Sequence, residues 1–249
     1  MTTTSVDTGP LTTGSAPVQD PPSPDRAPFR RRAVLPLVGI LGGFLSTAGL
    51  AGVGDAPDPH DTAAQMAAHF LEHRDAVLAS APLGYLGATG IAAFSFGLAR
   101  RLYRAGRRSP AVLVAAGGAG VAMYMFAIHV VYTTLAFQIA GTSAEATKSL
   151  FMLTIMATPA YGFATAVMVG ATAWGMRGTG ILPRWLLRGS AAGAFIAVLS
   201  FFGLAESDFW YPDNQQQFVA NVALLFIDIS AITLLVRAAR RRDHRKDSL

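Results

Sequence analysis

Six blocks of apolar residues divide the chain, and each block is long enough to cross a lipid bilayer as a helix. The hydrocarbon core of a bilayer is about 30 Å thick and needs about 20 residues of helix. The blocks show no apolar–polar alternation, and a chain in lipid satisfies its backbone only as helices or as a closed barrel. The blocks run over 33–53, 76–99, 111–137, 150–174, 190–205 and 218–236. The sequence therefore predicts an all-α fold, a polytopic membrane bundle with six transmembrane helices.

The composition of the chain agrees with this fold and excludes several functional classes. Hydrophobic residues make up 52% and charged residues only 14%, whereas soluble domains carry about 25% charged residues. The absence of cysteine excludes disulfides, thiolate metal sites and cysteine nucleophiles. His129 is the only histidine inside an apolar block, so paired haem ligands are missing, and no nucleotide-binding loop occurs. We therefore expect no cofactor.

The charged residues are divided between the two sides of the predicted membrane. Eighteen of the 20 basic residues lie in the two terminal segments or in the loops 100–108 and 177–188, and only Arg74 and Lys148 lie in the alternate loops. Basic residues collect on the cytoplasmic side, which predicts that both termini are cytoplasmic. The net charge of +5 then reports topology and contact with anionic lipids, and we expect no nucleic-acid partner.

This topology defines three segments of the chain. Residues 1–32 are rich in Thr, Ser, Pro and Gly and end in arginines, which predicts a disordered cytoplasmic tail. Residues 33–236 form the transmembrane domain, and residues 237–249 form a basic cytoplasmic tail. The predicted location is the cell membrane, with bilayer lipids as partners. A second copy of the chain or another membrane protein remains an open alternative.

The first outer loop carries a pair of histidines that suggests a metal site. Asp61 can cap a helix start, and nothing breaks a helix between Thr62 and Ala81. On this helix His69 and His73 share a face and, together with His60, offer imidazole ligands for a divalent ion. We favour the alternative of an exposed amphipathic helix. In that alternative Met66, Ala67 and Phe70 rest on the membrane interface.

Asp228 is the most unusual residue within the apolar blocks. It lies ten residues after Phe218, about 15 Å along a helix and close to the membrane midplane, where an ionisable group is by default a functional candidate. Asp228 shares a helical face with Gln217 and Asn221. One hypothesis is an outward-open cavity lined by Asp228, with Glu206 and Asp208 at its mouth as further acids. The candidate substrate-binding residues are Tyr85, Tyr124, Tyr161, Asn221 and Trp210.

A structural role for Asp228 is the alternative to this cavity. A neutral, protonated Asp228 could hydrogen-bond Tyr124 or Ser200 and hold two helices together. We slightly favour this structural role at the level of the sequence.

Three segments together resemble a known type of protein. They are VGILGGFLSTAGLAG, DTAAQMAAHFLEHRDAVLAS and LGATGIAAFSFGLARRLY, within about 35–105. They resemble a type of actinobacterial six-span membrane protein whose first outer loop ends in an FxxHR element, here Phe70 to Arg74. The resemblance implies a six-span fold in the membrane and brings no activity.

Three functional hypotheses follow from the sequence. The first is a structural or accessory membrane component. The second is a small secondary carrier coupled through Asp228. The third is an intramembrane enzyme, an acid-catalysed cyclase or isomerase, which would act on a lipid-soluble substrate with Asp228 as the acid.

Overall fold

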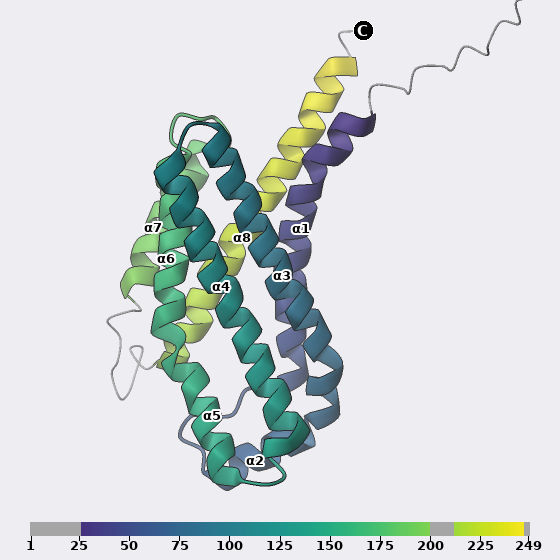
Figure 1. Cartoon of the computed structure of the whole chain (residues 1–249), viewed down its shortest axis with the longest axis vertical. Coiled ribbons are helices and arrows are strands. Elements are labelled where there is room, and N and C mark those ends of the chain that lie inside the picture. Colours follow the sequence, from purple (N-terminus) through teal and green to yellow (C-terminus); the bar gives the residue numbers. More distant parts are fainter. Residues whose placement is uncertain (1–25, 200–211, 247–249) are drawn as a thin grey trace, which may run out of the picture.

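The structure is a computed structural model that describes residues 26–199 and 212–246, and this part of the chain is helical without strands (Figure 1). The elements are α1 (Arg26–Leu50), η1 (Ala51–Val53), α2 (Ala63–Glu72), α3 (Arg74–Arg104), α4 (Arg108–Thr134), η2 (Leu135–Ile139), α5 (Ala144–Met156), α6 (Thr158–Gly175), α7 (Arg184–Leu199) and α8 (Pro212–Lys246). The all-α prediction is confirmed.

Five stretches of helix are long and apolar enough to cross a membrane. They are Ala33–Val53, Arg74–Arg104, Arg108–Ile139, Ala144–Gly175 and Asn221–Arg240. The predicted fifth block, 190–205, begins within α7, and its residues 200–205 lie outside the described part of the chain. α7 itself starts at Arg184 and has 16 residues. Its buried Leu186 and Leu187 therefore extend that block on the N-terminal side.

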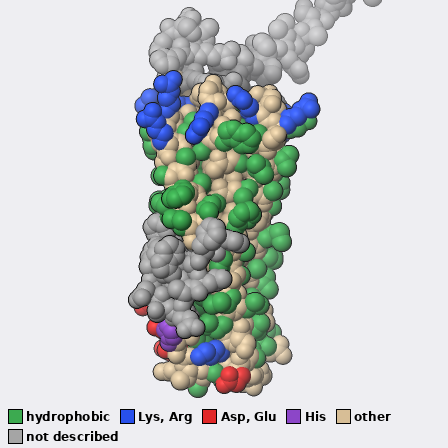
Figure 2. All heavy atoms as spheres, turned by 90° about the vertical axis from the view of Figure 1, so that its left-hand side faces the viewer, with side chains coloured by type: hydrophobic (Ala, Val, Ile, Leu, Met, Phe, Trp, Pro, Cys, Tyr) green, Lys and Arg blue, Asp and Glu red, His purple; other side chains and the backbone are tan. Residues whose placement is uncertain are grey.

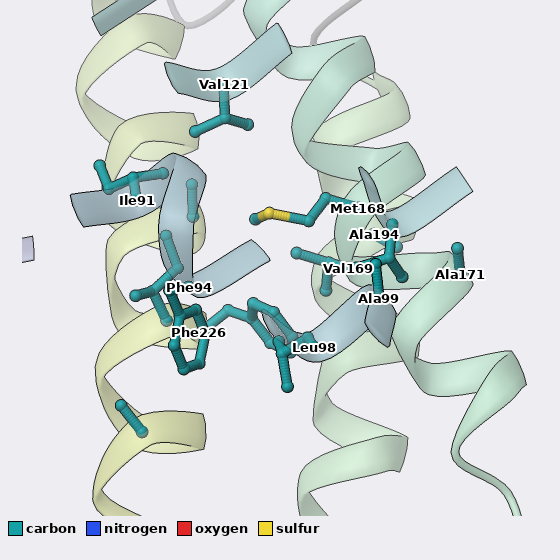
Figure 3. Close-up of a cluster of buried hydrophobic side chains, with 14 of the residues drawn as sticks. Ile91, Phe94, Leu98, Ala99, Val121, Met168, Val169, Ala171, Ala194 and Phe226 are labelled. Carbon is teal, nitrogen blue, oxygen red and sulfur yellow. The ribbon is translucent and has the colours of Figure 1, made fainter. Parts of the chain in front are cut away.

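The long helices pack side by side in a bundle. α1 packs on α3, α3 on α4, α4 on α6, α6 on α8 and α8 on α1, while α7 packs on α6 and α8. The interior is apolar and includes Ile91, Phe94, Val121, Met168 and Phe226 (Figure 3). Large apolar side chains are also exposed on the outer surface of the bundle, among them Phe44, Met123 and Phe195.

The surface of the bundle separates charge from apolar side chains. Figure 2 shows most Lys and Arg side chains of one face gathered at one end, and Asp, Glu and His side chains near the other end, where a basic side chain also lies. Hydrophobic side chains occupy the region between the two ends. This distribution is the one expected of a bundle that crosses a bilayer.

Glycines let α1 and α3 approach very closely. Methyl groups placed at Gly42 and Gly87 would lie 2.8 Å and 2.2 Å from backbone atoms of the opposing helix. Gly49 faces Gly84 in the same way, at 2.4 Å from its Cα atom. Small residues allow this contact between backbones where apolar burial cannot drive helices together in lipid. These glycines therefore serve packing within the chain.

The segment before the second span differs from its prediction. The N-cap of α2 is Thr62, not Asp61, and its capping box with Gln65 satisfies two backbone N–H groups. The helix is also not continuous to Ala81, because His73 leaves helical geometry between α2 and α3. The carboxylate of Asp61 instead accepts a hydrogen bond from the backbone nitrogen of Asp58 at 3.0 Å.

The apolar face of α2 packs on protein rather than on the membrane interface. Met66 and Phe70 are fully buried and Ala67 is 6% exposed. The Phe70 ring lies 5.7 Å from the ring of Tyr132 and 6.0 Å from that of Phe151. The interfacial position predicted for these residues is therefore wrong. α2 packs on α5 and η2, and its buried side chains belong to an apolar cluster that these elements share.

Two predicted helices are interrupted, and two extend into the predicted tails. The third span passes from α4 into the π-helical turn η2. The fourth is divided at Ala157 into α5 and α6, with Pro159 in the first turn of α6, where a proline costs no hydrogen bond. α1 begins at Arg26, within the segment predicted as a tail, and α8 continues to Lys246.

Candidate functional site

Asp228 lies on α8 and faces α1 at Gly43. It is partly buried, and a methyl group placed at Gly43 would lie 2.5 Å from its Oδ1 atom. A side chain at position 43 would require the carboxyl group of Asp228 to move. Oδ1 is buried and has no hydrogen-bond partner among the described residues. A buried carboxyl oxygen without a partner is unusual, because polar groups are normally satisfied when buried.

Two of the predicted tyrosines form a pair elsewhere in the bundle. The rings of Tyr124 and Tyr161 stack with centroids 4.5 Å apart. The Tyr124 hydroxyl donates to the carbonyl of Thr154 at 3.2 Å and lies 3.4 Å from Oγ1 of Thr158. Tyr124 therefore joins α4 to α5 and α6. Asp228 Oδ1 accepts no hydrogen bond within the described structure.

Tyr85 packs against His129, a histidine that is not among the predicted site residues. The Tyr85 hydroxyl donates to Oγ1 of Thr133 at 3.1 Å, and its ring lies edge-on to that of His129. His129 is 2% exposed, and its Nε2 atom is buried without a partner among the described residues. Methyl groups at Gly84 and Gly49 would lie 2.2 Å and 2.8 Å from its ring. The two glycines thus form the slot that holds the imidazole.

Asp228 and His129 both lie against α1, one on each side of Ser46. Gly43 contacts Asp228 and Gly49 contacts His129, and six residues of helix separate these positions by about 9 Å. Ser46 lies midway, is 1% exposed, and has a buried Oγ atom without a partner in the described structure. We call Asp228, Ser46 and His129 the α1 polar cluster, a set of residues along one helix whose Ser46 hydroxyl bonds neither of the other two in the described structure. It holds a carboxyl, a hydroxyl and an imidazole that can each take up or pass a proton.

The remaining predicted residues of the cavity are exposed or lie outside the described part of the chain. Asn221 lies on α8 but is exposed. Gln217 belongs to α8, and its side chain lies outside the described part. The other candidates in this group, Ser200, Glu206, Asp208 and Trp210, also lie outside the described residues.

Of the three histidines predicted to bind a metal, His69 and His73 lie side by side in the structure. The rings of His69 and His73 stack with centroids 4.3 Å apart. His69 Nε2 lies 2.9 Å from the carbonyl oxygen of Val53, and His73 Nδ1 lies 3.0 Å from that of His69. Each ring thus has one nitrogen engaged with backbone. Within the described residues, no group of three His, Asp or Glu side chains is placed to hold a metal ion, so His60 does not complete a site.

The sequence contains a signal for His129, the member of the α1 polar cluster that is not among the predicted site residues. His129 stands alone in an apolar block, and Gly84 and Gly49 stand in two other blocks. The match between an imidazole and two glycines depends on helix order and rotation, which sequence spacing does not give. No protein-family model, curated protein or solved structure matches the chain.

Proposed function

We propose that the chain is an integral protein of the cell membrane with six spans and cytoplasmic termini. The five long apolar helices and the charge-separated surface support this topology. The start of α1 and the end of α8 also lie at the same end of the bundle (Figure 1). An even number of crossings therefore fits the fold, with α7 as the fifth span.

The absence of cysteine allows a direct test of this topology. Ala56, Ala105 and Ala239 are exposed and stand in the first outer loop, after α3 and near the end of α8. Single Ala→Cys variants are treated with a membrane-impermeant maleimide in intact cells. We expect labelling of A56C in intact cells, and of A105C and A239C only after permeabilisation. Labelling of A239C from outside would refute the even number of spans.

We further propose that the protein is a small secondary carrier in which Asp228 binds a proton or a monovalent cation. The observation that carries this proposal is the buried Oδ1 atom, which lies against Gly43 without a partner. If the carboxyl group served only to join helices, both of its oxygens would form hydrogen bonds to neighbouring helices. An oxygen left free inside the bundle is available to an exchanging ion, which is the usual reason for an acid at this depth.

The other two hypotheses find less support among the described contacts. The role of Asp228 as a structural link required a bond to Tyr124 or Ser200. The Tyr124 hydroxyl contacts Thr154 and Thr158, and Ser200 lies outside the described residues. The enzyme hypothesis relied on Glu206 and Asp208 as further acids, and these also lie outside the described residues. The accessory role remains the outcome if the ion-binding test fails.

The test is infrared spectroscopy of the purified protein in lipid vesicles across a pH titration. A protonated carboxyl has a C=O stretching band that disappears on ionisation. We expect wild type to show a titrating band that is missing in Asp228→Asn. The matched control is Asp75→Asn, which removes an exposed carboxyl from the first turn of α3. The titration is repeated with sodium and with a large organic cation, and a sodium-dependent shift identifies a cation site.

The outcomes separate the hypotheses. A band that titrates in wild type and Asp75→Asn, and is lost in Asp228→Asn, supports the carrier. A carboxyl at position 228 that stays protonated or stays ionised over the whole titration contradicts ion exchange. That result would leave the accessory role as the better hypothesis.

A further inference from the structure

A basic pocket lies at the loop between α6 and α7, away from the α1 polar cluster. It has a volume of about 280 Å³ and is lined by Arg177, Gly178, Arg184, Leu187 and Arg188. Arg177 follows the end of α6, and the other two arginines belong to the first turns of α7. Three arginines from two segments therefore line one concave surface.

The charge of this pocket is not balanced by nearby acids. No acidic side chain lines it within the described structure. The sequence also has no Asp or Glu between Glu145 and Glu206, a stretch that includes the whole of α6 and α7. Three neighbouring cations repel one another, so a compact arrangement of this kind favours an anion between them. Guanidinium groups bind phosphate oxygens through paired hydrogen bonds.

The loop behind the pocket is held in place by α8. Arg237 donates hydrogen bonds to the carbonyl oxygens of Gly180 and Ile181, the latter at 2.7 Å. Gly178 and Gly180 both have positive φ, at 76° and 66°, which lets the loop turn tightly. The backbone nitrogen of Ile181 donates to Oγ1 of Thr179. A pocket whose loop is held in place by hydrogen bonds is preorganised, which lowers the entropy cost of binding.

The side chains around the pocket suit the interface of a membrane. Trp174 and Trp185 flank the loop and are 57% and 62% exposed. Exposed tryptophans of this kind lie at the level of lipid headgroups. Leu187 is almost fully buried and closes the pocket on its apolar side. Basic pockets between helices on the cytoplasmic side are known to take anionic headgroups.

We propose that this pocket is a binding site for a phosphate group, and that its ligand is the phosphodiester of an anionic lipid in the cytoplasmic leaflet. Arg177, Arg184 and Arg188 share the phosphate oxygens, and the glycerol and acyl chains lie along α7. The site goes beyond the carrier proposal and depends only on the membrane topology, because it involves no residue of the α1 polar cluster.

The test is calorimetric titration of the full chain in detergent micelles with three probes. They are short-chain phosphatidylglycerol, phosphatidylcholine with the same acyl chains, and inorganic phosphate. The pocket variant is Arg184→Gln with Arg188→Gln. The control is Arg100→Gln with Arg104→Gln, which removes the same charge from exposed positions at the end of α3. Melting temperatures without probe verify that each variant is folded.

We expect phosphatidylglycerol to bind one site in wild type and in the control. A charge-assisted hydrogen bond contributes about a tenfold factor in affinity, so the pocket variant should bind about 100-fold more weakly. The control should change affinity by no more than about twofold, because Arg100 and Arg104 are exposed and do not line the pocket, and salt screens exposed charges. An Arg184→Lys variant keeps the charge but not the paired geometry, and should lie in between.

The three probes distinguish the source of the phosphate. Binding of phosphatidylglycerol with little binding of inorganic phosphate supports the lipid site. Equal binding of inorganic phosphate would overturn the lipid as ligand and leave a site for a free phosphate. Equal loss of affinity in the pocket and control variants, or no binding of either anionic probe, would overturn the site itself. Neither result bears on the titration of Asp228, so the two proposals fail independently.

Discussion

Replacing Gly87 by alanine should force α1 and α3 apart and destabilise the bundle. The new methyl group would lie 2.2 Å from the backbone nitrogen of Ser46 and 2.6 Å from its Cα atom. Ordinary contact begins at 3.4 Å, so one helix must retreat by about 1.2 Å at this point. A side chain could rotate away from such a contact, but a helix backbone moves only as a body. The glycines along the same interface would then lose their contacts too.

The magnitude follows from the cost of overpacking, which is about 1–3 kcal/mol in well-packed proteins. Gly189→Ala is the matched control. Gly189 lies within α7 and has nothing within 4 Å of an added methyl group. That substitution should therefore stabilise the chain by about 0.5–1 kcal/mol through helix propensity. The two variants should differ in free energy of unfolding by at least about 1.5 kcal/mol.

The measurement is reversible unfolding in mixed micelles of a mild detergent and dodecyl sulfate, with both variants beside wild type. Equal stability of Gly87→Ala and Gly189→Ala would refute the close approach of the two helices. A second check adds Ser46→Gly to Gly87→Ala. Because the contact involves the Ser46 backbone, removal of its side chain should not restore stability. Recovery in the double variant would show that the side chain carries the clash.

Two further predictions concern the end of the bundle that holds α2. Phe70→Ala should lower the free energy of unfolding by about 3–5 kcal/mol, because Phe70 is fully buried beside Tyr132. The control is Phe137→Ala, which should change the free energy of unfolding by less than about 0.5 kcal/mol, because the Phe137 side chain is 63% exposed. Similar losses at both positions in the same unfolding assay would argue against a protein-packed α2. Thr62→Ala should remove the capping box and cost about 1 kcal/mol. Amide exchange should then be faster in the first turn of α2 than in the last turns of α3, and unchanged exchange in α2 would contradict the cap.

Much of the fold could be predicted from the sequence, because a membrane span is recorded in its own residues. The blocks 33–53 and 76–99 coincide with or fall inside helices of the structure. The helix breaks were harder to predict. No breaker stands near His73, whereas the break at Ala157 lies just before Pro159, a residue that ends a preceding helix.

The candidate site could be predicted only in part. Asp228 was singled out because an acid in an apolar block is visible in the sequence itself. Its neighbour could not be foreseen: Tyr124, a chemically reasonable partner, faces α5 and α6, and the carboxyl group lies against Gly43. His129 acquires its importance from Gly49 and Gly84, which lie about 80 and 45 residues before it in the chain.

The class of fold and the residues that are unusual for it therefore follow from the amino-acid pattern alone. Apolar length and charge act locally, so they can be read without knowing which helices are neighbours. Only the tertiary structure decided that the apolar face of α2 packs on protein, that Arg177 and Arg188 share a pocket, and that Asp228 has a free oxygen. Each of these depends on the order and rotation of helices. Contacts between distant residues set that rotation, and the periodicity of a single helix does not contain it.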